Sequence, residues 1–465
     1  MEDLSTKLLT LINVSSAKPN NKKRIKFDGL DKPSSKKRRN ISTSDETVNK
    51  KKEEENTVEE EENTNNIENE NSDSDDTNDN GEEVEENDDQ QDTFTSHYHP
   101  NTDLIKGEII NKVNNRNWNK HSKSNKHLFG AYTEFNLDKE SSSLNRNVHI
   151  SPKFLGHKKH LNDINILSQY KDILVNKDVK NVEHFKQSTC LHIHNHLLRT
   201  RNKVLKNNEK LSHYYSSEGN QNQSPPECQD QGFTRPKVLI LTPFRNAALD
   251  WIKNLDKFSP TTQTDHKVRL YNEYSLPKGV NDKILTAPSG TYPSDHVDTF
   301  KGNIDDNFKI GIKLTRKSFK PYSDFYSSDI IIASPLGLKL LFEKTKDNDY
   351  LSSIEVLVCD KLNVILMQNW SHLLEVFNNL NHIPKESHDC DFSRVKPWYL
   401  DGMSKYLRQT IMFSSIDNIE INNLFNNYCL NVEGKLKTDY KSEGVLDQIP
   451  DGIKQVSYYF FFKKK

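Results

Sequence analysis

Four short apolar runs, each followed by a small or polar residue and then by a stretch with helical spacing, constrain the fold of this chain most. The runs are Val238–Leu241 before Thr242-Pro243, Ile330–Ala333 before Ser334-Pro335, Ile354–Val358 before Asp360, and Thr410–Phe413 before Ser414-Ser415. Strands that are apolar along their whole length are typical of parallel sheets buried on both faces. The sequence therefore predicts an α/β fold, with a parallel sheet and helices on both of its faces.

The polar residues after these runs are expected at the carboxyl ends of the strands, where open α/β sheets bind ligands. We call this set the carboxyl rim and define it as Thr242–Arg245, Ser334–Gly337, Asp360–Asn363 and Ser414-Ser415. The core domain is expected to span 236–437, with an insertion at 260–326 that is too long for a compact crossover. Inside the insertion, Leu270, Ile284 and Ile310–Leu314 are candidates for one or two additional strands.

A large part of the chain is expected to be solvated, because only 33% of its residues are hydrophobic and its mean hydropathy is −0.87. Residues 1–91 have almost no aromatic side chains and are predicted to be a long disordered tail. Its basic clusters at 22–39 resemble a bipartite nuclear import signal. The acidic block at 53–92 holds 20 of the 67 acidic residues and no Lys or Arg. The remainder has 65 basic and 47 acidic residues, a surplus that favours a polyanionic partner, although it is equally compatible with a merely solubilising surface.

The segment at 92–235 is interpreted as an extension whose helices pack on the core, with two helices predicted between Ile164 and Leu211. Five cysteines without a CxxC pair indicate a reducing compartment. The first residues have no basic leader, and no apolar run is long enough to cross a membrane. Neither secretion nor membrane insertion is therefore expected.

The residues needed to bind and hydrolyse a nucleotide are not found. A glycine-rich loop of the form GxxxxGK[ST] would cradle the phosphates, but the segment expected to supply it, before Lys237, reads SEGNQNQSPPECQDQGFTRPK. The acidic pair that would hold magnesium and position water is replaced by Asp360-Lys361-Leu362-Asn363. Because the ammonium of Lys361 cannot act as a base, the sequence predicts no hydrolysis and no cofactor.

A metal site is also not expected. Cys190, His192, His194 and His196 alternate, which places them on one face only in a strand, whereas their surroundings have helical spacing. The group at His382–Asp391, with His388 and Cys390, has no better support. No GxSxG elbow or Cys/His nucleophile arrangement is present.

Cations beside hydroxyl or aromatic side chains are candidates for gripping an RNA backbone. They are Thr242 and Arg245 on the carboxyl rim, the run Thr315, Arg316 and Lys317, and Arg394 near Trp398. The alternative is that Arg245 pairs locally and that Trp398 lies in the core.

Several strings closely resemble the digestive organ expansion factor family, also called the U-three small nucleolar RNA-associated protein 25 family. They are CLHIHNHLL, QDQGFTRPKVLILTPFRNAALDWI, GNIDDNFKIGIK, FYSSDIIIASPLGLKLL, LSSIEVLVCDKLNVILMQNW and DFSRVKPWYLDGMSKYLRQTIMFSSI. The resemblance runs from about Asp92 to about Val456, thinly before Cys190 and densely after it.

The resemblance implies a degenerate, DEAD-box-like protein with a RecA-like (P-loop NTPase-type) fold in the nucleolar small-subunit processome. The implied partners are pre-ribosomal RNA, the U-three small nucleolar ribonucleoprotein and other processome proteins, without membrane or small-molecule substrate. By the same analogy Thr242–Arg245 and Ser334–Leu338 stand at helicase RNA-backbone motifs, and Ser334 joins the residues predicted to contact RNA. Asp360, Lys361 and Asn363 stand at the acidic box, and Ser414 and Ser415 at the motif that couples ATP to RNA.

Helicase-like members continue into a second RecA-like domain, which this chain is expected to lack. The segment 438–465 ends in Tyr458-Tyr459-Phe460-Phe461-Phe462 and three lysines, which resembles translated AT-rich DNA. We expect an incorrectly defined gene end or an unspliced intron there.

The function expected from these observations is a non-catalytic scaffold for pre-ribosomal RNA processing and small-subunit biogenesis in the nucleus and nucleolus. The acidic block would compete for basic segments of partners. An RNA-dependent ATPase or helicase with an unconventional nucleotide site is the alternative, and an acidic-tailed nuclear chaperone without RNA contact is a third interpretation.

Overall fold

The computed structural model describes residues 92–125, 130–137, 148–176, 179–216, 224–277, 279–388 and 390–439. All of them belong to the second of the two units into which the chain divides, Asp73–Lys465. The predicted tail at 1–91, with its basic clusters and nearly all of its acidic block, lies outside the described residues, as does the chain after Asp439. The expectations for those segments therefore stay predictions.

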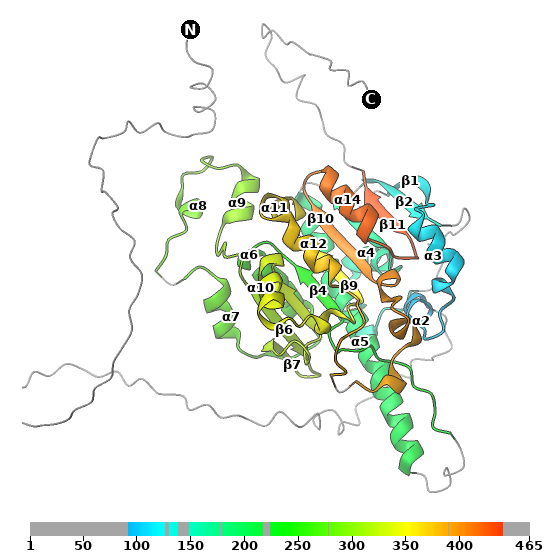
Figure 1. Cartoon of the computed structure of the whole chain (residues 1–465). Coiled ribbons are helices and arrows are strands. Elements are labelled where there is room, and N and C mark those ends of the chain that lie inside the picture. The colour runs from blue at the N-terminus through cyan, green and yellow to red at the C-terminus, as the bar shows by residue number, and fades with distance from the viewer. Residues whose placement is uncertain are drawn as a thin grey trace, which may run out of the picture. The chain divides into compact units, whose positions relative to one another are not determined.

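Eleven strands within the described residues form one sheet, in the order β1-β2-β11-β3-β10-β9-β4-β8-β6-β7-β5 (Figure 1). The strands are β1 (Asn119–Asn125), β2 (Gly130–Asn136), β3 (Asp172–Asn176), β4 (Val238–Leu241), β5 (Gln263–Thr264), β6 (Lys309–Leu314), β7 (Ser318–Ser323), β8 (Ile330–Ala333), β9 (Val356–Cys359), β10 (Gln409–Ser414) and β11 (Lys435–Thr438). Each pair of neighbouring strands from β11 through β3, β10, β9 and β4 to β8 is parallel. On either side of this parallel core the pairing is antiparallel, between β1, β2 and β11 and between β6 and β8. The predicted parallel core is therefore confirmed.

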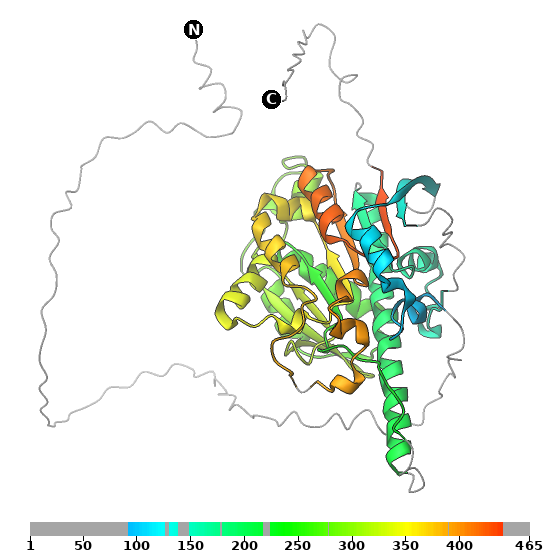
Figure 2. The ribbon, with the colours of Figure 1, turned by 45° about the vertical axis from the view of Figure 1, so that its right-hand side comes forward.

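Helices cover both faces of this sheet, as predicted (Figures 1 and 2). They are α2 (Thr93–His97), α3 (Gly107–Asn114), α4 (Leu161–Leu167), α5 (Val179–Ser216), α6 (Arg245–Phe258), α7 (Lys267–Tyr274), α8 (Lys283–Thr286), α9 (Ser294–Phe300), α10 (Pro335–Thr345), α11 (Leu362–Met367), α12 (Trp370–Asn378), α13 (Pro397–Leu400) and α14 (Ile419–Tyr428). None of the helices in the described part of the chain is both long and apolar enough to cross a bilayer.

Alternate residues of each central strand enter two different cores. Ile240 and Val358 pack with α4, α5, α6 and α7 on one face, whereas Leu239 and Leu357 pack with α10, α11, α12 and α14 on the other. A third cluster, which includes Phe94 of α2 and Trp398 of α13, packs beside these two. Burial of both faces explains why the central strands are apolar throughout.

The structure corrects the interpretation of the segment at 92–235. Two helices were predicted between Ile164 and Leu211, but α4 and α5 are separated by strand β3, which pairs with β10 and β11. Tyr170, Ile173 and Leu174 continue the three- and four-residue spacing of α4, and β3 is buried on both faces, so it has no alternation to distinguish it from a helix. The expected boundary at residue 235 therefore does not separate an extension from the sheet.

The insertion at 260–326 forms part of the same sheet. Of its three predicted strand candidates, Ile310–Leu314 lies in β6, which pairs with β7 and β8, so this prediction is confirmed. Leu270 and Ile284 instead lie in α7 and α8.

Candidate functional site

The carboxyl ends of β3 and β10 are the place where this topology would bind a ligand. Helices α5 and α6, which follow β3 and β4, pack on one face, whereas α10, α11 and α14, which follow β8, β9 and β10, pack on the other. Because β3 and β10 are neighbours, the chain leaves the sheet toward opposite faces at this point. Open α/β sheets bind ligands in the crevice outside such a switch point.

A phosphate-binding loop does not fit at this switch point. It would have to connect β3 to α5, but Asn176 ends the strand and Val179 begins the helix, so only two residues lie between them. The GxxxxGK[ST] cradle alone has eight positions. The connection is therefore too short to wrap around a triphosphate.

The structure also corrects the expected location of that loop. The segment before Lys237 was expected to supply it, yet the described part of that segment runs beside residues 394–396. Gln231 forms an isolated bridge with Val395, and the backbone N–H of Asp230 donates to the carbonyl of Arg394 over 3.0 Å. Phe233 belongs to the third cluster with Trp398. The segment leads into the amino end of β4, whereas a phosphate loop must follow the carboxyl end of a strand.

The carboxylate of Asp360, after β9, is fully used by hydrogen bonds inside the protein. Its Oδ1 lies 2.7 Å from Nζ of Lys186 and accepts the backbone N–H of Lys361 over 2.8 Å. Its Oδ2 accepts from Nζ of Lys186 over 2.8 Å and from Nε1 of Trp251 over 2.9 Å. A carboxylate has about four lone-pair sites. Asp360 therefore has no acceptor position left for a water molecule on magnesium.

Aromatic rings lie beside this pair, of which Asp360 is buried and Lys186 is partly exposed. Asp360 is 2% exposed, and Nζ of Lys186 lies 5.6 Å from the ring centre of Phe413 and 5.9 Å from that of Trp251. Burial alone would raise the pKa of Asp360, but the ammonium of Lys186 and its hydrogen bond hold the pKa below its usual value. Lys186 on α5 thus supplies the positive charge that an acidic box would otherwise obtain from a metal ion.

The residue beside Asp360 is engaged as well. Lys361 has a left-handed backbone, with φ 50°, and its Nζ donates to the carbonyl of Asp298 over 2.9 Å. Asn363 accepts a long hydrogen bond, 3.4 Å, from the backbone N–H of Ser415. The acidic-box position and the Ser414-Ser415 position are therefore in contact through an internal hydrogen bond.

Three hydroxyl residues of the carboxyl rim, Thr242, Ser334 and Ser414, are buried. The hydroxyl of Ser334 accepts from the backbone N–H of Gly337 over 2.9 Å and donates to the carbonyl of Asp306, so it caps α10. The hydroxyl of Ser414 donates to the carbonyl of Ile416 over 2.7 Å. Thr242 is fully buried. None of these three hydroxyls faces solvent, and the contact of Thr242 and Ser334 with RNA stays a prediction.

Arg245 holds the insertion over the carboxyl rim. Its guanidinium donates to the carboxylate of Asp305 over 2.8 Å and to the carbonyls of Asn307 and Glu273 over 3.1 and 3.3 Å. The side-chain amide of Asn246 donates to the carbonyl of Lys301 over 2.7 Å. The return segment of the insertion therefore lies across the start of α6.

Arg394 and Trp398 lie away from the carboxyl rim. Arg394 forms a two-point ion pair with Asp230, at 2.7 and 3.1 Å, and donates to Asn208 of α5 over 2.6 Å. Trp398 is 1% exposed and donates to the carbonyl of His99 over 3.2 Å. The structure thus places Arg394 as a brace between α5 and the segment before β4, and Trp398 in the third cluster.

The run Thr315, Arg316 and Lys317 forms the turn between β6 and β7. The hydroxyl of Thr315 accepts from the backbone N–H of Ser318 over 2.8 Å and closes the turn. Arg316 and Lys317 are exposed. Of the cations predicted to contact RNA, these two are the ones that face solvent.

The alternating histidines do not converge. His192 bonds to the side chain of Gln409 and His194 to the carbonyl of Leu255, each over 2.8 Å, and His196 lies 2.9 Å from the carboxylate of Glu355. They lie on helix α5, as their surroundings indicated, so they point toward different elements.

A second group could hold a metal by its composition: Asp347, Asp349 and His388 have ligand atoms within 4.8 Å of one another. Its oxygens already have partners. Asp349 accepts from Nε2 of His388 over 3.1 Å and from the backbone N–H of Lys385 over 2.8 Å, and Asp347 accepts from the hydroxyl of Tyr326 over 2.7 Å. This group therefore fixes the loop before α13 without requiring an ion.

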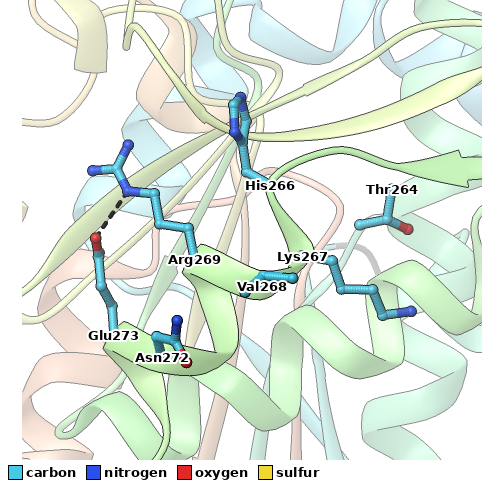
Figure 3. A pocket seen from close by; sticks show the side chains of 7 residues that line it. All are labelled: Thr264, His266, Lys267, Val268, Arg269, Asn272 and Glu273. Carbon is cyan, nitrogen blue, oxygen red and sulfur yellow. Dashed lines mark hydrogen bonds and ion pairs between the residues drawn. The ribbon is translucent and has the colours of Figure 1, made fainter. Parts of the chain in front are cut away.

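A surface depression of about 780 Å³ lies on the insertion beside α7 (Figure 3). The residues that line it are Thr264, His266, Lys267, Val268, Arg269, Asn272 and Glu273. Arg269 and Glu273 pair across one helical turn at 2.8 Å.

The residues that the sequence interpretation missed are Lys186 and Trp251. Lys186 was not recognised because β3 was taken for helix, so the helix after it was not identified as a neighbour of the carboxyl rim. The run Asp172–Asn176, directly followed by a long helical pattern, was the available signal.

Comparison with known proteins gives one matching family, described as "UTP25, NTP hydrolase-like domain", over residues 170–436. Curated relatives are called U3 small nucleolar RNA-associated protein 25. The one from Schizosaccharomyces pombe is 44% identical over 286 residues, which cover 60% of this chain and 41% of the relative. The one from Schizosaccharomyces japonicus is 46% identical over 269 residues, which cover 57% and 40%. The chain thus matches about two fifths of the length of these relatives.

Solved structures of DEAD-box proteins are distantly similar. The yeast splicing factor Prp28 is 12% identical with a TM-score of 0.29, covering 61% of this chain and 45% of that one. A DEAD box protein from Methanococcus jannaschii is 10% identical with a TM-score of 0.30, covering 61% and 53%.

Proposed function

Because the chain belongs to the family of the UTP25, NTP hydrolase-like domain, we propose that it is a non-catalytic component of the small-subunit processome. In this role it scaffolds pre-ribosomal RNA processing and small ribosomal subunit biogenesis in the nucleolus. Its partners are pre-ribosomal RNA, the U3 small nucleolar ribonucleoprotein and other processome proteins. The name of the curated relatives, which refers to U3 small nucleolar RNA, supports this proposal.

The observation that carries the non-catalytic part is the saturated carboxylate of Asp360. A nucleotide-hydrolysing site needs this group to hold a magnesium-bound water and needs a second carboxylate to orient the attacking water. Here the first is paired with Lys186, and the second position is Lys361, whose Nζ is bound to a backbone carbonyl. The two-residue connection between β3 and α5 supports the same conclusion, because it leaves no loop for the phosphates.

The purified full chain should show no ATP turnover with magnesium and RNA beyond that of an Asp360→Ala variant. RNA-stimulated turnover that disappears in Asp360→Ala would instead support an RNA-dependent ATPase with an unconventional site.

Association with the processome is tested separately. Affinity-tagged full chain expressed in cells should co-purify U3 small nucleolar RNA and crosslink to pre-ribosomal RNA, and it should localise to the nucleolus. Recovery of neither RNA would contradict the scaffold role.

A further inference from the structure

The hairpin of β6 and β7 concentrates positive charge at one side of the sheet. From Lys309 to Ser323 the chain contains five cations and no acidic residue. The five are Lys309, Lys313, Arg316, Lys317 and Lys320. Lys313 is half-buried and the other four are exposed. Because exposed cations occur without any interspersed acid, the hairpin has a single sign of charge along its length.

Two of these lysines are direct neighbours across the strands. Lys313 of β6 is paired in register with Lys320 of β7. Like charges directly opposite each other destabilise an antiparallel pair. This arrangement therefore works against the stability of the hairpin and is not explained by the fold.

Two acidic side chains close to the hairpin are engaged by other groups. Asp329 forms an ion pair with Arg235 at 2.9 Å and accepts the backbone N–H of Leu314 over 2.7 Å. Asp324 accepts the backbone N–H of Tyr326 over 3.0 Å. Both carboxylates thus serve the strands around β8.

The positive surface continues onto α5. Nη1 of Arg201 donates to the carbonyl of Leu314 over 3.2 Å, so the helix passes beside the hairpin turn. Beyond this point α5 carries Lys203, Lys206 and Lys210 at spacings of three and four residues, which places them on one side of the helix. The carboxyl end of α5 extends past the neighbouring elements in both views (Figures 1 and 2).

We propose that the β6–β7 hairpin is a binding surface for the phosphate backbone of RNA. The proposal rests on the function proposed above and names the part of the chain that holds the RNA. The hairpin offers no exposed ring for stacking on bases, because Phe319 is buried and the guanidinium of Arg269 covers Tyr322, 4.0 Å from the ring centre. Contact with phosphates alone predicts binding without sequence preference and with strong salt dependence.

The test compares two variants of the full chain that lose the same charge. The hairpin variant carries Lys313→Gln, Arg316→Gln, Lys317→Gln and Lys320→Gln. The control variant carries Lys153→Gln, Lys158→Gln, Lys385→Gln and Lys405→Gln, at exposed lysines on other parts of the surface. Binding of a short labelled oligouridylate is measured by fluorescence anisotropy between about 50 and about 200 mM salt.

The hairpin variant should bind about tenfold more weakly or worse, and its plot of log K against log salt should be shallower by about 3, since each lost phosphate contact removes about 0.7. The control variant should keep the parent slope. A further variant with Lys313→Arg and Lys320→Arg should keep the parent affinity, because it preserves the charge. Thermal unfolding of the hairpin variant should occur at or above the parent temperature, because a repulsion has been removed.

Equal affinity and slope for parent and hairpin variant would overturn this inference and leave the scaffold function intact. A parent chain that does not bind the oligouridylate even at low salt would contradict both. Polyglutamate that displaces the RNA as efficiently as unlabelled oligouridylate would overturn the assignment to RNA in favour of an acidic polypeptide.

Discussion

Replacing Lys186 with methionine tests whether the Lys186–Asp360 ion pair fills the place where a nucleotide site would bind its metal ion. In that case the ammonium of Lys186 balances the buried carboxylate of Asp360. The substitution keeps the aliphatic stem of the side chain but removes the ammonium. Asp360, which is 2% exposed, would keep only the indole N–H of Trp251 and the backbone N–H of Lys361. An unpaired charge would then remain in an environment that excludes water.

Breaking a buried ion pair by removing one partner costs about 3–5 kcal/mol. Lys186→Met should therefore lower the free energy of unfolding by about this amount. The double variant Lys186→Met, Asp360→Asn should be less destabilised than the sum of the two single variants by about 2–3 kcal/mol, because no charge is left unpaired. The surface pair Lys253–Asp250, 3.9 Å apart with both side chains about half exposed, is the matched control. Lys253→Met should cost at most about 0.5 kcal/mol.

Urea unfolding followed by circular dichroism gives the change in the free energy of unfolding, relative to the parent, for Lys186→Met, Asp360→Asn, the double variant and Lys253→Met. Acid titration provides a second measurement with a definite sign. The folded pKa of Asp360 is lowered, so its contribution is present above the unfolded value, about 3.9 for Asp, and is lost as the pH falls through the folded value. In Lys186→Met burial is no longer offset by the ammonium and raises the pKa of Asp360, so the sign reverses: the ionised carboxylate destabilises the chain, and the difference in stability from the parent should shrink as the pH falls. A Lys186→Met chain as stable as its parent would show that Asp360 is hydrated and that the site is not filled as described.

Three further predictions follow from particular contacts. Lys320→Glu should create an ion pair with Lys313 and raise the free energy of unfolding by about 0.2–1 kcal/mol, measured by urea titration, while weakening RNA binding. Gly337→Ala should lower the free energy of unfolding by about 1–3 kcal/mol in the same urea titration, because the added Cβ would stand 2.3 Å from the carbonyl oxygen of Phe308. Gly107→Ala, also in a helix but with open space around it, is the control and should not destabilise the chain. ATP with magnesium should leave the unfolding temperature unchanged, whereas a ligand at about 100 times its Kd would add about 2.7 kcal/mol.

The parallel core could be predicted from the sequence because its strands are buried on both faces and end in recognisable polar residues. Val238–Leu241 and Ile330–Ala333 are apolar throughout and are followed by Thr242 and Ser334. The sequence therefore predicts both that these runs are strands and which end of each strand lies at the carboxyl rim. Strand β3 could not be predicted in this way, because a fully buried strand shows no alternation of polar and apolar residues. In addition, Tyr170 and Ile173 extend the helical spacing of the residues before them. Periodicity alone cannot separate a buried strand from a buried helix.

The local sequence shows which residues stand at the helicase-like positions but not which groups they contact. The ammonium of Lys361 is visible in the sequence, whereas the segment before Lys237, expected to supply a phosphate loop, leads into the amino end of β4. The partners of Asp360, Arg245 and Arg394 come from residues far away in the chain, such as Lys186, 174 residues earlier. No local pattern specifies such pairings. The sequence therefore does not show that Arg245 and Arg394 are bound to carboxylates and carbonyls inside the protein.

The pairing of Asp360 also explains how a domain without a phosphate loop keeps its acidic side chain buried. In a working nucleotide site the charge of such a carboxylate is balanced by magnesium when the ligand is bound and by water when it is not. Once Trp251 and Phe413 exclude water, the carboxylate needs a permanent cation, and Lys186 of α5 provides it. The same helix then extends beyond the sheet and passes the hairpin turn at Leu314. If α5 is fixed at one end by Asp360 and lies beside the basic hairpin further along, Lys186→Met should loosen the RNA-binding surface as well as the core. Its RNA affinity should therefore fall although no cation of the hairpin has been removed, and an unchanged affinity would show that the two regions are independent.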